Sequence, residues 1–232
     1  MVVNKALIRV SNPTPRKSLY PKDLMVAVIH SKSAVNGANK PKGERKDSPF
    51  QLLLIAASTG GPLALQKVLP QLKTNVGFPI LVVQHMPKDF TRDFAERLNR
   101  LSKIEVREAE DGDRLKPGLA LLAPGGKQME LEANRTIKIR ATRHKELYKP
   151  SADITFTSVA HRFMGRVLAI VMTGMGADGR FGVKILKSKG ARIWVQDEQS
   201  CTIYGMPKAV ADAGLADQII GLDEIGKRFR EM

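Results

Sequence analysis

The stretch RVLAIVMTGMGADG, residues 166–179, decides the fold. Its first eight residues are almost entirely apolar, and such a run predicts a strand buried on both faces, not one that alternates between core and solvent. Glycines follow at positions 174, 176 and 179, which indicates a tight turn into a helix over 179–189. A buried strand followed directly by a helix is the repeating unit of a parallel sheet covered by helices.

The same pattern recurs outward from this stretch in both directions. Further strands are predicted at QLLLIAAS (51–58), FPILVVQH (78–85), IEVREAE (104–110), LALLAPG (119–125), ARIWVQD (191–197) and Gln218–Ile220. Helices are predicted from the glycines at 60–61 to Leu72, over 88–101, over 152–164 and, as the final helix, near 207–213. In the helix over 88–101, we expect Phe90, Phe94, Leu98 and Leu101 to form the buried face.

MELEANRTIKIRA (129–141) predicts a hairpin that turns near Ala133-Asn134. The fold class is therefore α/β: a doubly wound, mainly parallel sheet with helices on both faces and a small antiparallel hairpin. Residues 31–48 are polar, charged and rich in Gly and Pro, as linkers are. We expect a basic N-terminal extension over 1–48 and a compact domain over 49–232.

The net charge of +15 is concentrated near the N-terminus. Residues 1–50 contain ten Lys and Arg against three acids, which gives +7 and leaves +8 for the other 182 residues. A basic tail favours solubility or loose attraction to an acidic partner. No zinc-finger, RNP or helix-turn-helix signature accompanies it, so we do not expect nucleic-acid binding.

Other classes of protein are excluded by what the composition lacks. No apolar run approaches 18 residues, so we expect no direct membrane insertion. The N-terminus lacks the apolar core and cleavage site of a signal peptide, and a single cysteine, Cys201, is typical of a reducing compartment. These features predict a cytoplasmic protein. The four histidines and one cysteine show no metal-ligand spacing, so we expect neither a metal nor a cofactor.

Three reactive residues follow the three most apolar predicted strands. Ser58 follows LLLIAA, His85 follows ILVVQ, and Asp178 lies shortly after VLAIVMT. Since the carboxyl ends of parallel strands meet at one edge of a sheet, we expect these three side chains to lie together. A serine becomes a nucleophile when an imidazole takes its proton, and a carboxylate orients that imidazole. The glycines and Pro62 after Ser58 favour a helix start, where backbone N–H groups would face an oxyanion.

Each residue also has a structural interpretation. Ser58 could cap the following helix, His85 could be a structural histidine, and Asp178 could cap the helix after Gly179. Ser58 lacks the G-x-S-x-G elbow, and the chain order Ser, His, Asp differs from that of α/β-hydrolases. A hydrolase would therefore belong to another lineage.

A dinucleotide site is the main rival hypothesis. The glycines at 174, 176 and 179, with Asp197 ending the next strand, satisfy much of the Rossmann fingerprint. Against it, Asp178 would place a negative charge beside a pyrophosphate, and only 53 residues follow Gly179. A scaffold that binds signalling proteins without turnover is a third hypothesis.

Seven motifs in order resemble the chemotaxis protein-glutamate methylesterase family, the catalytic domain of CheB-type proteins. They are AASTGGP (56–62), VVQHMP (82–87), EAEDGDRLKPG (108–118), APGGKQM (123–129), KPSAD (149–153), MTGMGADG (172–179) and SCTIYGMPKAV (200–210). The resemblance implies Ser58 as nucleophile, His85 as base and Asp178 as the orienting carboxylate. It also places Thr59 and Met175 in the lining of the site, with the Met175 backbone N–H as an oxyanion donor.

The resemblance further implies hydrolysis of glutamate γ-methyl esters on the cytoplasmic helices of methyl-accepting chemoreceptors, and deamidation of particular receptor glutamines. It calls for no metal or nucleotide. SCTIYGMP is expected to be a loop near the site, and Arg140, Arg143, Lys145 and Lys149 to engage an acidic receptor bundle or remain solvated. The family usually carries a phosphoacceptor receiver domain, but the 48 residues before the catalytic domain here have no acidic cluster for Mg²⁺. Two expectations stand open: a chain without phosphorylation control, or a fragment with its linker.

Overall fold

The computed structural model describes residues 50–163 and 166–232. The main sheet has seven strands in the order β3-β4-β2-β1-β7-β8-β9, and every neighbouring pair is parallel. The strands are β1 (Leu52–Ala57), β2 (Ile80–Gln84), β3 (Glu105–Glu108), β4 (Leu119–Leu122), β7 (Val167–Val171), β8 (Arg192–Gln196) and β9 (Gln218–Ile220). The predicted doubly wound, mainly parallel α/β fold is confirmed, and the predicted extension over 1–48 lies outside the described residues.

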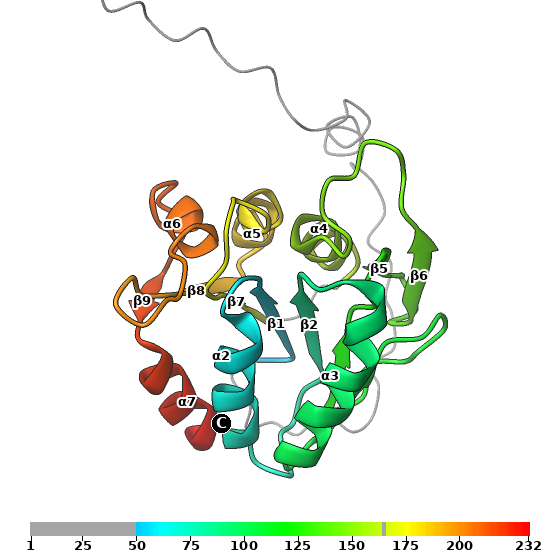
Figure 1. Ribbon diagram of the computed structural model, residues 1–232, viewed down its shortest axis with the longest axis horizontal. Coiled ribbons are helices and arrows are strands. Elements are labelled where there is room, and N and C mark those ends of the chain that lie inside the picture. The colour runs from blue at the N-terminus through cyan, green and yellow to red at the C-terminus, as the bar shows by residue number, and fades with distance from the viewer. Residues whose placement is uncertain (1–49, 164–165) are drawn as a thin grey trace, which may run out of the picture. The chain divides into compact units, whose positions relative to one another are not determined.

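Helices cover both faces of this sheet (Figure 1). One layer holds α2 (Gly61–Val68), α3 (Lys88–Leu101) and α7 (Leu222–Glu231), with the short 3-10 helix η1 (Leu69–Gln71). The other holds α4 (Ala152–Arg162), α5 (Arg180–Ser188) and α6 (Met206–Ala211). The strands β1, β2 and β7 are buried at every position because they receive a helix layer on each side. None of the helices in the described part of the chain is long and apolar enough to cross a bilayer.

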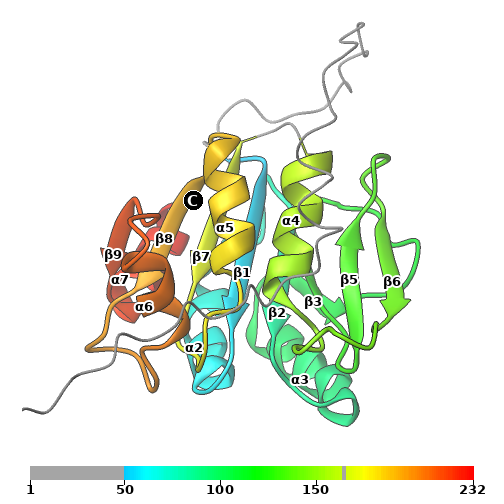
Figure 2. The same cartoon turned by 90° about the horizontal axis from the view of Figure 1, so that it is seen from above.

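Strand β1 lies at the point where the direction of winding reverses. The chain leaves β1 through α2 to reach β2 on one side, and leaves β7, on the other side of β1, through α5 to reach β8. The helices α2 and α5 therefore lie on opposite faces of the sheet (Figure 2). Such a reversal opens a crevice at the carboxyl ends of the strands, where ligands of open α/β sheets bind.

The predicted hairpin is confirmed as a separate two-stranded sheet, β5 (Lys127–Leu131) and β6 (Ile137–Ala141). Side chains of α4 fasten it to the main body. The hydroxyl of Thr155 donates to the carbonyl of Met129 at 2.7 Å, and the Leu131 N–H donates to Ser158 Oγ at 2.8 Å. The hairpin thereby holds the helix whose first turn enters the site described below.

Two details of the sequence prediction are wrong. The helix near 207–213 is not the last, since α7 follows β9. Six residues of the α7 sequence LDEIGKRFRE are charged, and its large buried side chains, Ile225 and Phe229, lie four residues apart on one face. The helix is amphipathic, and this short pattern was not identified from the sequence. In α3, Phe94 and Leu98 are buried as expected, but Phe90 and Leu101 are exposed. These two lie in the first turn and at the last residue of α3, whereas its buried residues lie between them.

Candidate active site

Ser58 and His85 leave the sheet side by side. The register of β1 and β2 pairs Ala57 with Gln84, so the next residue of each strand lies at the same level. The backbone continues this pairing, since the His85 N–H donates to the Ala57 carbonyl at 3.0 Å. On the other side of β1, the Ser58 N–H donates to the Thr173 carbonyl at 2.9 Å. The strand ends that carry the predicted residues are thus held in one row.

His85 and Asp178 form a direct hydrogen bond. The distance from His85 Nε2 to Asp178 Oδ2 is 2.7 Å, and the two side chains are 13% and 1% exposed. Because Nε2 is engaged by the carboxylate, Nδ1 is the ring nitrogen left for a proton from another group. The described residues include no hydrogen bond between Ser58 Oγ and His85 that would complete the row. Such bonds are often long before a substrate is bound.

The first turn of α4 holds the Asp178 carboxylate. Ser151 Oγ and the Asp153 N–H donate to Oδ1 at 2.8 and 3.0 Å, and the Ala152 N–H donates to Oδ2 at 2.6 Å. Helix N-termini carry a partial positive charge and unpaired N–H groups, both of which stabilise an anion. Together with His85, these donors satisfy both carboxylate oxygens within a buried site. The carboxylate therefore has one orientation, with Oδ2 towards the imidazole.

The capping roles considered for Ser58 and Asp178 are wrong. The N-cap of α2 is Gly60, with φ of 82°, and that of α5 is Gly179, with φ of 94°; neither helix has a side-chain cap. Both positions are left-handed, and glycine adopts that conformation without steric cost. Ser58 and Asp178 therefore do not cap the helices that follow them in the sequence.

The glycines of the loop after β7 serve close packing. A Cβ at Gly174 would lie 2.7 Å from the Cβ of Ser58 and 2.5 Å from the sulfur of Met206. A Cβ at Gly176 would collide with the hydroxyl of Tyr148. These side chains occupy the space that a dinucleotide loop keeps open for a pyrophosphate, so the geometry does not favour the Rossmann hypothesis.

Thr59 and Met175 flank Ser58 on the two neighbouring loops. Both are exposed, Met175 to 64% of its surface. The carbonyl of Thr59 accepts from Thr173 Oγ1 at 2.9 Å, which ties the loop after β1 to the end of β7. Among the described residues, the backbone N–H groups of Thr59 and Met175 have no hydrogen-bond acceptor. Free, exposed N–H groups beside a serine are suitable donors to an oxyanion.

Residues that the sequence reasoning did not single out complete the surroundings of His85. The ring of Tyr148 stacks on the imidazole, with centroids 4.6 Å apart and planes inclined by 11°. The buried side chain of Gln128 donates to the Tyr148 carbonyl at 2.8 Å and accepts from the Ser151 N–H at 2.9 Å. Ser151 was identifiable as the residue before a helix, an N-cap position. Nothing in the local sequence around Tyr148 indicates a ring contact with residue 85.

The loop SCTIYGMP does lie beside the site, as predicted. The Gly174 N–H donates to the Ile203 carbonyl at 2.9 Å, and the Gly205 and Met206 N–H groups donate to the Gly174 carbonyl at 3.0 and 2.8 Å. Cys201 lies in this loop, where burial raises the pKa of its thiol to about 11. The thiol is thus protonated near neutral pH, which fits a structural residue.

Arg140, which was expected to engage a receptor bundle or remain solvated, forms two ion pairs within the protein. Its guanidinium is 19% exposed and pairs with Glu130 at 2.5 Å and with Glu146 at 2.7 Å. The hydrogen bonds that Arg140 donates to Glu146 are the largest cause of the raised pKa of Arg140. Arg143, Lys145 and Lys149 are exposed on the segment between β6 and α4 and remain available to a partner.

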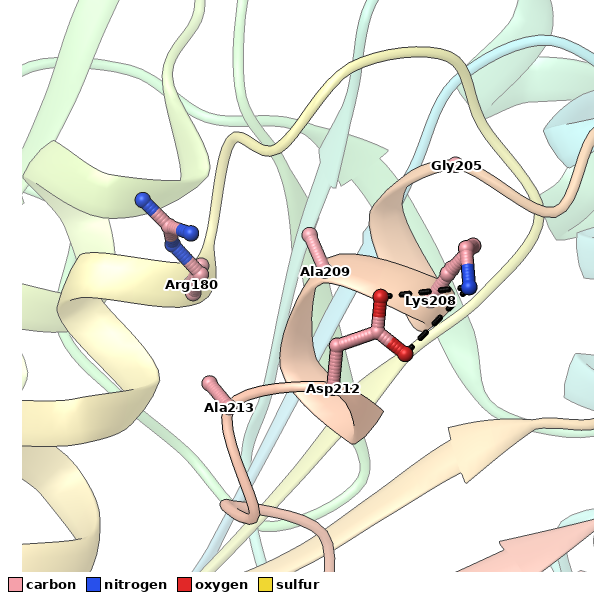
Figure 3. A pocket seen from close by; sticks show the side chains of 6 residues that line it. All are labelled: Arg180, Gly205, Lys208, Ala209, Asp212 and Ala213. Atoms are coloured by element: carbon pink, nitrogen blue, oxygen red, sulfur yellow. Dashed lines mark hydrogen bonds and ion pairs between the residues drawn. The ribbon is translucent and has the colours of Figure 1, made fainter. Parts of the chain in front are cut away.

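A surface pocket of about 360 Å³ lies between the start of α5 and α6 (Figure 3). Its lining comprises Arg180, Gly205, Lys208, Ala209, Asp212 and Ala213, and none of the three predicted catalytic residues. Lys208 and Asp212 pair with each other across one wall, at 3.1 Å. Across the described ranges, no group of three or more His, Cys, Asp or Glu residues is placed to hold a metal ion.

The fold and this row of side chains define an α/β protein whose sheet edge carries a serine, a histidine and a buried carboxylate from three adjacent strands. The chain belongs to the CheB methylesterase family, whose model matches residues 53–229. It is 55% identical over 186 residues to the protein-glutamate methylesterase/protein-glutamine glutaminase of group 1 operon of Pseudomonas putida, and 54% identical to a protein-glutamate methylesterase/protein-glutamine glutaminase of Pseudomonas aeruginosa.

Each of these alignments covers 80% of this chain and 50% of the relative, so the chain spans about half the length of the curated relatives it matches. The crystal structure of the Thermotoga maritima CheB methylesterase catalytic domain superposes with a TM-score of 0.74 at 35% identity. That comparison covers 79% of this chain and 99% of the Thermotoga chain. The family suggested by the seven motifs is confirmed.

Proposed function

We propose that this protein is a serine hydrolase that removes the methyl group from glutamate γ-methyl esters of chemoreceptors and deamidates particular receptor glutamines. The observation that carries the proposal is the row formed by Ser58, His85 and Asp178, with the imidazole fixed at 2.7 Å from a buried carboxylate. The family supports the substrate, since the curated relatives are named for both reactions.

In the proposed mechanism, His85 Nδ1 accepts the hydroxyl proton of Ser58 as the serine oxygen attacks the γ-carbonyl carbon. Asp178 stabilises the imidazolium that forms. The backbone N–H of Met175, with that of Thr59 beside it, donates to the oxyanion. The intermediate collapses when His85 returns the proton to the leaving group, which departs as methanol from an ester or as ammonia from an amide.

The second half of the reaction repeats these roles with water as nucleophile. His85 takes a proton from water, the hydroxide attacks the acyl-enzyme, and the proton returns to Ser58 as the glutamate is released. No step requires a metal or a nucleotide. The exposed loops around Ser58 favour a shallow site, which suits a side chain presented by a folded helical bundle on the cytoplasmic part of a receptor. The exposed Arg143, Lys145 and Lys149 would attract an acidic bundle.

The test is methanol release from methylated chemoreceptor. Replacing Ser58 with Ala is expected to lower the rate by at least about 10³-fold, because the nucleophile is lost. Ser188→Ala, an exposed serine at the end of α5, is the matched control and should leave the rate unchanged. Undiminished release by the Ser58 variant would exclude the proposed nucleophile. A wild-type protein that binds receptor without releasing methanol would instead favour a non-enzymatic scaffold.

A further inference from the structure

One aromatic side chain, Tyr148, lies against His85 and against the loop that carries Asp178. The ring of Tyr148 lies parallel to the imidazole of His85, 4.6 Å away. The hydroxyl lies at the loop after β7, close to Gly176, two residues before Asp178. Tyr148 thus touches the base on one side and the loop that carries the carboxylate on the other.

A glycine in the loop after β7 leaves room for the Tyr148 side chain. Gly176 has φ of 88°, and a Cβ there would collide with the Tyr148 hydroxyl. On the other side, Gln128 holds the carbonyl of Tyr148 and the N–H of Ser151. The tyrosine is therefore held at its backbone carbonyl, and its ring and hydroxyl are packed against His85 and Gly176.

The stacked ring suits the proposed role of His85 as a general base. His85 must keep Nε2 towards Asp178 and Nδ1 towards Ser58, and rotation about its side-chain bonds would break both contacts. A parallel ring on one face limits that rotation. The face of an aromatic ring also attracts cations, so it stabilises the imidazolium that exists only after the serine proton has moved. Burial and the nearby Asp178 charge raise the pKa of the Tyr148 phenol, which keeps it neutral.

We propose that Tyr148 is a positioning residue for the base: it holds the imidazole of His85 in the plane that serves both Ser58 and Asp178, and stabilises its protonated form during acyl transfer. This inference rests on the proposed hydrolase function for its kinetic consequence. Its geometric part does not depend on any activity. The ring, not the hydroxyl, is the group that acts on His85.

Two substitutions separate the ring from the hydroxyl. Tyr148→Phe keeps the stacked ring and removes only the hydroxyl, so kcat should fall by no more than about threefold. Tyr148→Leu keeps an apolar side chain but loses the aromatic face. We expect it to lower kcat by roughly tenfold or more with KM unchanged. The control is Leu147→Ala, since that neighbouring side chain is 77% exposed, and it should retain wild-type kcat.

An independent readout keeps this test apart from that of the proposed function. In proton NMR, the carbon-bound imidazole protons of His85 should be displaced upfield by the Tyr148 ring in wild type and in Tyr148→Phe, and should return downfield in Tyr148→Leu. The rate at which a fluorophosphonate labels Ser58 should follow the same order. Absence of methanol release by wild type would count against the proposed function alone. Imidazole signals that do not move in Tyr148→Leu, or equal kcat values for the Leu and Phe variants, would overturn the role of Tyr148.

Discussion

Replacing Asp178 with Asn should damage both stability and catalysis, by amounts that follow from its hydrogen bonds. The carboxylate accepts four bonds within a buried site: two on Oδ1, from Ser151 and Asp153, and two on Oδ2, from Ala152 and His85. An amide has one oxygen and one NH₂ group, so one of these positions must become a donor that faces donors.

Either orientation of the amide has a definite consequence. With NH₂ in the place of Oδ1, Ser151 can turn its hydroxyl to accept, but the Asp153 N–H loses its acceptor. With NH₂ in the place of Oδ2, the Ala152 N–H is left unpaired and His85 Nε2 must accept, which moves the imidazole proton to Nδ1. One buried N–H without a partner costs about 1–3 kcal/mol of stability. The first orientation removes the charge that stabilises the imidazolium, and the second gives the wrong tautomer, so kcat should fall about 10³–10⁴-fold.

The assays are methanol release from methylated receptor and equilibrium unfolding in urea. Asp212→Asn is the matched control, because that carboxylate is 62% exposed and pairs only with Lys208 among the described residues. It should change neither quantity appreciably. An Asp178→Asn variant with kcat within tenfold of wild type would refute the assigned role of the carboxylate. Unchanged stability would refute the reasoning on the α4 donors.

Two further outcomes follow from the packing and the ion pairs. Gly174→Ala should lower stability by about 1–3 kcal/mol and reduce methanol release, because its Cβ would lie 2.7 Å from that of Ser58. The control is Gly226→Ala in α7, where the nearest contact of an added Cβ is at 3.4 Å, and this variant should be tolerated in the same urea and activity assays. Two hydrogen bonds from Arg107, at 2.6 and 2.7 Å, hold the pKa of Asp113 below its usual value. The ionised carboxylate therefore contributes to the stability of the fold above the unfolded pKa near 4, and this contribution is lost as the pH falls through the lowered folded pKa. The difference in unfolding free energy between wild type and Asp113→Asn, about 1 kcal/mol at neutral pH, should therefore shrink as the pH falls below about 5. A difference that is constant with pH would contradict this assignment.

The three central strands, β1, β2 and β7, could be predicted from sequence because each is almost entirely apolar. The apolar runs around Ile55, Val82 and Ile170 identify these strands as buried without any information about their tertiary contacts. Helix α7 was not predicted, because only two of its ten residues are large and buried and its apolar face is limited to this one pair four residues apart. The exposed Phe90 shows the converse, since an apolar residue at a helix start can lie beyond the core.

The candidate site also contains residues that the sequence predicts and residues that it does not predict. Ser58, His85 and Asp178 each follow a predictable strand, so the rule that strand ends meet at one edge brings them together. The donors to Asp178 and the ring on His85 come from a segment about 30 residues before Asp178 in the chain, beyond the hairpin. Their positions depend on how α4 docks on β5, which no local pattern records. Supporting residues of this kind are specified by tertiary packing alone.

The central place of β1 also has a consequence for how the molecule assembles. Leu52 pairs with Val167, which lies 115 residues further along the chain (167 − 52). Closing so long a loop is entropically costly and slow, whereas β1 can pair with β2 through a short crossover. A nascent chain that has not yet produced β7 holds Ser58 on a strand with one open edge, and apolar open edges promote aggregation. The strand that covers this edge, β7, is followed in the next loop by Asp178, so protection of the edge and assembly of the three site residues occur in the same folding step.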